Sequence, residues 1–89
     1  MGLKYDVISP FVGTIERILF RSGDRVQEGE SLFTLVDGRK SIDIFSPVTG
    51  YVDAVEVEKG DHVIEGMILA SIVLSNDETN TIEGQAVLS

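Results

Sequence analysis

The sequence predicts an all-β fold of roughly eight short strands, four in each of two equivalent halves, folded into a small barrel or sandwich. Three observations lead to this fold class. A stretch of 31 residues is repeated at a spacing of 37, apolar and polar residues alternate with period 2, and no segment keeps a helical periodicity. Two copies are too few for a solenoid, so we expect one closed domain with a pseudo-twofold axis.

The repeat aligns residues 6–36 with residues 43–73 without a gap. Eleven pairs are identical, and most of the others keep their chemical character. The identical pairs are Asp6/Asp43, Ser9/Ser46, Pro10/Pro47, Gly13/Gly50, Gly23/Gly60, Asp24/Asp61, Val26/Val63, Glu28/Glu65, Gly29/Gly66, Leu32/Leu69 and Val36/Val73. A match of this length is not expected by chance, so the two halves should share one local structure.

The first strand of each half should end at a Ser-Pro pair. Tyr5 and Val7 correspond to Ile42 and Ile44, and each pair of apolar residues is separated by an aspartate. Proline cannot donate to a β-ladder and holds the residue before it in an extended conformation, so each strand should stop there.

The second strand of each half should contain a bulge. Val55 and Val57 alternate with glutamates, which is the pattern of a strand with one buried face. The preceding apolar residue, Val52, lies three positions upstream of Val55 and breaks the period, which predicts a bulge or bend. The first half has the same spacing between Ile15 and Ile18.

Gly-Asp and Glu-Gly pairs mark the turns between the later strands of each half. The apolar residues of both halves should then form a single core. We expect its members to be Ile18, Phe20, Val26, Leu32, Leu35, Val55, Val57, Val63, Leu69 and Ile72.

The link between the halves predicts a β-hairpin. Apolar runs at residues 32–36 and 42–45 flank Asp37-Gly38, and an Asp-Gly pair is a strong signal for a type I′ turn with positive φ at both central residues. The next two residues, Arg39 and Lys40, are cations on a chain that is otherwise strongly acidic.

Length and composition limit the functions to be considered. The 89 residues allow one small domain, expected at residues 1–75, with a polar, flexible tail at residues 76–89. A formal net charge of −8 without a basic stripe argues against a nucleic-acid partner. The absence of cysteine excludes disulfides and thiolate metal sites. No apolar run approaches the roughly 20 residues of a membrane span, and the first residues lack a signal-peptide pattern, so we expect a cytoplasmic protein with no membrane partner.

The Ser-Pro, Gly-Asp-x-Val and Glu-Gly elements together resemble those of the biotinyl/lipoyl carrier domains. The matching segments are residues 9–14 and 22–29 in the first half and residues 46–50 and 59–66 in the second. The resemblance covers about residues 5–74. It implies a flattened barrel, or sandwich, of two four-stranded antiparallel sheets related by a quasi-twofold axis.

In that family a lysine on the central hairpin is acylated with biotin or lipoate. It lies eleven residues before the glycine matched here by Gly50, which places Arg39 at its position and Lys40 one residue later. The Ala-Met-Lys-Met of biotinyl domains and the Asp-Lys-Ala of lipoyl domains are both absent. Arginine cannot serve as an acyl-accepting nucleophile, whereas lysine can once it is deprotonated.

The direction of these two side chains depends on the turn. If Lys40 begins the return strand, its amine leaves at a different angle from that of a tip residue, because neighbouring strand residues face opposite sides. If Asp37-Gly38 forms the two-residue turn, Arg39 and Lys40 both belong to the strand and neither caps the hairpin.

Three functional hypotheses follow from the resemblance. We favour a non-carrier relative, which would be an interaction or regulatory subunit of a carboxylase or 2-oxo acid dehydrogenase-type complex without a certain cofactor. The alternative is a swinging-arm carrier, in which a biotin or lipoate ligase modifies Lys40 and the chemistry belongs to the cofactor and the partner enzymes. A stand-alone enzyme is the least favoured of the three.

The remaining candidate residues have structural explanations. His62 should be a surface residue, because no second histidine and no cysteine is present to complete a metal site. Glu16, Asp53, Glu56 and Glu58 should lie on the solvent faces of strands, and general acid–base catalysis by a pair of them is the alternative. We therefore predict no metal site and no catalytic residue.

Overall fold

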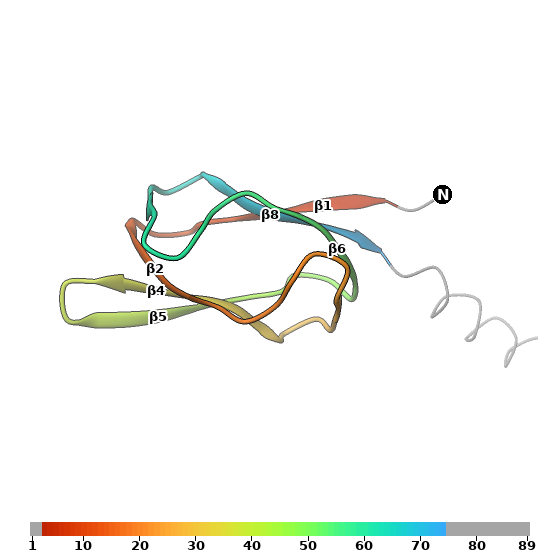
Figure 1. Ribbon diagram of the computed structural model, residues 1–89, viewed down its shortest axis with the longest axis horizontal. Coiled ribbons are helices and arrows are strands. Elements are labelled where there is room, and N and C mark those ends of the chain that lie inside the picture. The colour runs from red at the N-terminus through yellow and green to blue at the C-terminus, as the bar shows by residue number, and fades with distance from the viewer. Residues whose placement is uncertain (1–2, 75–89) are drawn as a thin grey trace, which may run out of the picture.

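The computed structural model describes residues 3–74, which form two four-stranded antiparallel sheets that enclose one core (Figure 1). The strands are β1 (Lys4–Ile8), β2 (Gly13–Ile18), β3 (Arg25–Val26), β4 (Ser31–Asp37), β5 (Lys40–Phe45), β6 (Gly50–Val55), β7 (His62–Val63) and β8 (Ile68–Leu74). The predicted all-β sandwich is thus confirmed. The predicted tail at residues 76–89 lies outside the described residues. Within the described part, the chain has no helix with the length and apolar character needed to cross a bilayer.

The two repeats are related by a pseudo-twofold axis that maps one sheet onto the other. One sheet has the strand order β1-β8-β6-β3, and the other has the order β5-β4-β2-β7. When each strand is replaced by its equivalent in the other half, the first order becomes the second. Each sheet therefore takes two strands from each half, which confirms the predicted pseudo-twofold symmetry.

Both predicted bulges are present at equivalent positions. The register of β2 against β4 shifts between Ile15 and Arg17, and the register of β6 against β8 shifts between Val52 and Ala54. The extra residue in the second case is Asp53, which is exposed, whereas Ile15 and Val52 are buried. A bulge leaves one residue unpaired and bends the strand, and this explains the break in the apolar period.

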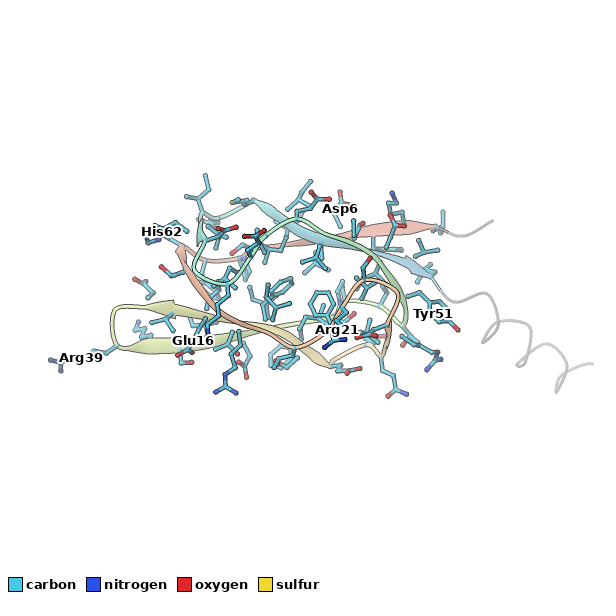
Figure 2. The ribbon with its side chains drawn as sticks, viewed as in Figure 1. Asp6, Glu16, Arg21, Arg39, Tyr51 and His62 are labelled. Carbon is cyan, nitrogen blue, oxygen red and sulfur yellow. The ribbon has the colours of Figure 1, made fainter. Side chains whose placement is uncertain are left out.

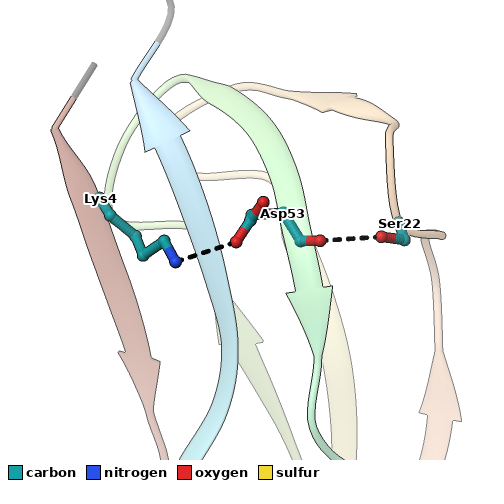
Figure 3. Close-up of polar contacts among 3 residues, drawn as sticks. All are labelled: Lys4, Ser22 and Asp53. Carbon is teal, nitrogen blue, oxygen red and sulfur yellow. Dashed lines mark hydrogen bonds and ion pairs between the residues drawn. The ribbon is translucent and has the colours of Figure 1, made fainter. Parts of the chain in front are cut away.

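The bulge residue Asp53 joins β6 to two neighbouring segments (Figure 3). Its carboxylate Oδ2 lies 3.0 Å from Nζ of Lys4 on β1. Its backbone carbonyl accepts a hydrogen bond of 3.0 Å from the hydroxyl of Ser22, in the turn before β3. Contacts from this one residue thus reach the segments of both edge strands of the β1-β8-β6-β3 sheet.

The Ser-Pro pairs end β1 and β5 as predicted, and their serines are buried. The Ser9 hydroxyl donates a 2.6 Å hydrogen bond to the carbonyl of Phe11, and the Ser46 hydroxyl donates an equivalent bond to the carbonyl of Val48. A buried hydroxyl is costly without a partner, so these local bonds allow the chain to turn inside the core.

The core draws on both halves of the chain. At its centre the rings of Phe20 and Phe33 meet edge to face, with centroids 5.1 Å apart. Two predicted members, Ile18 and Val55, are only partly buried because they end their strands beyond the bulges. The buried apolar residues are Val7, Ile15, Phe20, Val26, Leu32, Phe33, Leu35, Ile44, Val52, Val57, Val63, Leu69, Ala70 and Ile72.

Candidate functional site

The β4–β5 hairpin carries both site residues that the sequence predicts, and its far end projects from the body of the molecule (Figure 1). The hairpin is anchored by β4, in which Leu32, Phe33 and Leu35 are fully buried. Its partner β5 lies at the edge of the sheet and pairs with β4 along its whole length. One buried strand thus holds an exposed tip in a defined position.

The two strands are joined by a two-residue loop, Gly38-Arg39. Asp37 ends β4, Lys40 begins β5, and these two residues pair with each other across the strands. Gly38 has a φ of +64°, and no residue other than glycine has a positive φ in the described part of the chain. A positive φ at the first central residue alone is the pattern of a type II′ turn.

This loop corrects one detail of the sequence prediction. A hairpin is present where the Asp-Gly pair predicted one, but the two central residues are Gly38 and Arg39 instead of Asp37 and Gly38. The alternative in which Arg39 and Lys40 both belong to the strand is therefore wrong. The tight turn needs glycine at its first central position, and pairing continues through the aspartate before it.

Arg39 lies at the tip, and Lys40 starts the return strand. The side chain of Arg39 extends away from the hairpin into solvent (Figure 2). Lys40 is also exposed, and strand alternation places it on the same face of the hairpin as Ile42 and Ile44. The two cations therefore leave the hairpin in different directions, as the sequence predicted for a strand beginning at Lys40.

Neither tip cation is neutralised by a neighbour in the described structure. Asp37 is paired with Lys40 in the strand register, but no ion pair to Arg39 or Lys40 is found among residues 3–74. The tip thus presents a guanidinium and an ammonium group to solvent on a chain whose net charge is −8.

The chemistry of the tip decides whether a prosthetic group fits it. Covalent attachment of biotin or lipoate needs a nucleophilic amine, and the guanidinium of Arg39 stays protonated and does not accept acyl groups. The residue at the tip therefore does not fit such a group. The amine of Lys40 is chemically competent, but it belongs to β5 and not to the loop.

The other predicted candidates lie on the surface. His62 is exposed on β7, and its Nδ1 lies 2.9 Å from Oγ1 of Thr14 on β2. Within residues 3–74, no group of three or more His, Cys, Asp or Glu side chains is arranged to hold a metal ion. Glu16, Asp53 and Glu56 are exposed, as predicted for residues on solvent faces, and so is Glu58.

One surface feature was missed by the reasoning from sequence. Exposed apolar side chains gather on the β1–β2 loop and the β7–β8 turn, at the end of the molecule from which the hairpin projects (Figure 1). A comparison of the two repeats could have found it, because Val12 and Ile64 replace a threonine and a glutamine of the other half.

Comparison with protein families supports the assignment of the fold. Residues 5–72 match the model of the Biotin_lipoyl family, described as biotin-requiring enzyme. Domains of this family are carriers and do not catalyse reactions themselves. No curated protein gives a significant match to the chain.

Solved structures of two carboxylases contain a region with the same fold. One is the urea carboxylase of Kluyveromyces lactis, with a TM-score of 0.75 and 20% identity over 82% of this chain. The other is a single-chain, multi-domain long-chain acyl-CoA carboxylase, with a TM-score of 0.76 and 20% identity over 93% of this chain. The chain spans only 6% and 8% of the lengths of these proteins, so the likeness concerns one region of each.

Proposed function

The chain belongs to the biotinyl/lipoyl domain family, and on that premise we propose that it is a member without a carrier role. It acts as an interaction or regulatory subunit of a carboxylase or 2-oxo acid dehydrogenase-type complex. The chain itself is not an enzyme: catalysis belongs to its partners, and this chain contributes a folded surface. We propose a cytoplasmic location for the assembly.

One observation carries the proposal. Arg39 stands at the tip of the β4–β5 hairpin, where the family resemblance assigns the acylated lysine. A guanidinium keeps its proton and carries no acyl group, so the usual swinging arm has no attachment point there. The fold that presents the tip is complete, with a buried strand behind it. A domain of this kind retains its surfaces for partner recognition.

The partner class is supported by the two carboxylases that contain a region with the same fold. Both carboxylases with a similar region are much longer than this chain, which covers less than a tenth of each. In those proteins the region is one part of a larger enzyme. We therefore propose enzymes of this class as the partners.

A carrier modified at Lys40 is the second candidate function. The observation in its favour is that Lys40 is exposed and lies one residue beyond the tip, within the segment that a ligase would approach. A biotin or lipoate ligase would then be a partner, and biotin or lipoate would be the cofactor. The chain would move a carboxyl or acyl group between partner active sites.

Intact-mass measurement separates the two functions. The full chain is co-expressed with a biotin ligase, and separately with a lipoate ligase, in medium that supplies the acid. We expect the mass of the unmodified chain in both cases. The chain has only three lysines, Lys4, Lys40 and Lys59, so any adduct is quickly located.

Lysine variants supply the controls. An added mass of biotin or lipoate that is lost in Lys40→Arg and kept in Lys4→Arg and Lys59→Arg would establish the carrier function and overturn our proposal. The reverse substitution, Arg39→Lys, places an amine at the tip and is expected to create an acceptor. Its modification by the same ligase preparation would show that the assay detects a competent hairpin.

A further inference from the structure

The two halves of the described chain, residues 3–37 and 40–74, are held together mainly by pairing between their strands. The strand pairs that join one half to the other are β1–β8, β2–β7, β3–β6 and β4–β5. Pairing inside a half is limited to β2–β4 in the first and β6–β8 in the second. The contacts between the halves are the same whether the halves belong to one chain or to two.

The covalent link between the halves is the loop Gly38-Arg39, which has few contacts of its own. Neither residue forms a backbone hydrogen bond with another turn or loop within residues 3–74. A Cβ atom added at Gly38 would meet no atom within 4 Å beyond its chain neighbours, and Arg39 is exposed. Opening the loop therefore disturbs no packing.

An opened loop leaves every strand pair of the hairpin available to a second copy of the chain. In the closed hairpin Asp37 lies opposite Lys40, and Leu35 lies opposite Ile42. If residues 37–40 run straight instead, β4 and β5 form one long strand, and the same residues pair with those of a second, antiparallel copy. A twofold axis then passes through the middle of this two-stranded ribbon. Glycine adopts an extended conformation as readily as the φ of +64° that Gly38 has in the closed loop.

The position of the hairpin leaves space for this arrangement. Its tip projects beyond the body of the molecule, so the two bodies would lie at opposite ends of the ribbon (Figure 1). The middle of the ribbon carries Arg39 and Lys40 of both copies, between two bodies on chains of net charge −8. These cations offset part of the repulsion between the acidic bodies.

We propose that two copies of this chain swap halves through the β4–β5 hairpin. In this swapped dimer, residues 3–37 of each copy pair with residues 40–74 of the other. A two-residue loop is the kind of short hinge through which swapping occurs, and swapping uses contacts that the monomer already has. The swap also withdraws the projecting tip, because Gly38 and Arg39 come to lie in the middle of the ribbon. The domain then has one form with a free tip and one without, and this inference does not rest on the proposed function.

Refolding of the full chain at two concentrations tests the proposal. The chain is unfolded in urea, returned to buffer at micromolar and at millimolar concentration, and examined by size-exclusion chromatography with light scattering. We expect monomer at the low concentration and a fraction of dimer at the high one, because two open chains must meet before their halves pair. The separated dimer should persist after dilution, since its return to monomer requires all the pairs between the halves to open.

Two introduced cysteine pairs that share position 73 show whether the dimer is swapped. Val73 lies opposite Lys4 of the other half on one side and opposite Tyr51 of its own half on the other side. Directly opposed residues of antiparallel strands have Cα atoms about 4.5–5.5 Å apart, which suits a disulfide. The chain has no cysteine of its own, so an introduced pair has no competitor.

The two pairs give different products when the separated dimer is oxidised. Lys4→Cys with Val73→Cys should give a covalent dimer on a denaturing gel without reductant, because the paired residues come from different copies. The control, Tyr51→Cys with Val73→Cys, should give single chains from the same kind of dimer, because both cysteines lie in one half. The separated monomer of either variant should give single chains.

Loop length supplies a second measurement. Removal of Gly38 and Arg39 leaves no residues to close the turn but keeps Asp37 opposite Lys40 in the ribbon. This variant should be dimeric at both concentrations. Insertion of a short Gly-Ser segment between Gly38 and Arg39 relaxes the closed loop and should abolish the dimer.

Several results would overturn the swapped dimer. They are monomer at both concentrations of the full chain, a dimer whose Lys4→Cys and Val73→Cys pair links only within single chains, a folded monomer of the loop-deletion variant, and a ladder of larger covalent species. If the deletion variant does not fold, the cysteine pairs on the unchanged loop still decide. Failure of the proposed function looks different, because it appears as a biotin or lipoate mass on Lys40, which neither the chromatography nor the disulfide pattern reports.

Discussion

Gly50 packs against the carbonyl of Val73 so closely that a Cβ atom at Gly50 would overlap with the carbonyl oxygen. Its equivalent, Gly13, faces Val36 in the same way, but a Cβ there would lie 3.0 Å from the carbonyl oxygen. The two positions are both glycine and are related by the pseudo-twofold axis, yet Gly50 leaves less room for a side chain than Gly13 does.

This difference predicts unequal effects of the same substitution. Gly50→Ala should lower the free energy of unfolding by about 3 kcal/mol, because the backbone of β8 must move to make room, whereas Gly13→Ala should lower it by about 1 kcal/mol. Urea unfolding of both variants measures the difference. Equal losses would contradict the close approach at Gly50.

The loop glycine of the hairpin predicts a second asymmetry. Gly38→Ala should lower the free energy of unfolding by about 1 kcal/mol, because Gly38 has a positive φ that alanine adopts at a cost. Arg39→Ala should change it by less than about 0.5 kcal/mol, because Arg39 is exposed and has no positive φ. Thermal unfolding of the two variants provides the test, and a larger loss for Arg39→Ala would exclude this loop conformation.

The aromatic pair in the core predicts a large loss of stability. Phe33 is fully buried and its ring meets that of Phe20 with an interplanar angle of 88°. Phe33→Ala should cost about 3–5 kcal/mol, through lost burial and the cavity that remains. The control is Phe45→Ala, on an exposed phenylalanine, which should cost less than about 0.5 kcal/mol. Chemical unfolding that gives similar values for both would contradict the burial of Phe33.

The ion pair between Lys4 and Asp53 predicts a small, salt-dependent coupling. Both side chains are about half exposed, at 58% and 44%, so water screens their attraction. A double-mutant cycle with Lys4→Met and Asp53→Asn should give a coupling below about 1 kcal/mol. The coupling should shrink further in high salt. A coupling that is large and independent of salt would mean that the pair is shielded from solvent.

Most of the fold was predictable because the chain repeats itself. Two weak strand patterns at the same positions in two copies reinforce each other, and the break in the apolar period at Ile15 and Val52 located both bulges. The Ser-Pro pairs marked the ends of β1 and β5 for a clear reason, since proline cannot donate to a ladder.

The details that escaped prediction depend on three-dimensional context. The loop residues shifted by one position because pairing between Asp37 and Lys40 decides which two residues remain unpaired. Burial of Phe33 next to Leu32 could not be read from alternation, because the register of β4 against β5 shifts between Ser31 and Phe33. The family position of Arg39 was predictable from residue counting alone, but its place at the tip required the turn.

The exchange of sheets between the two halves has a consequence for how the domain is put together. Neither half forms a sheet by itself, because each sheet contains two strands from the first half and two from the second. A single unit cut at the hairpin would leave every sheet half built and its core residues uncovered. Two identical single units, meeting as separate chains, would hold all the strands that the architecture needs. The β4–β5 hairpin is therefore also the covalent tether that makes one molecule of what is geometrically a dimer.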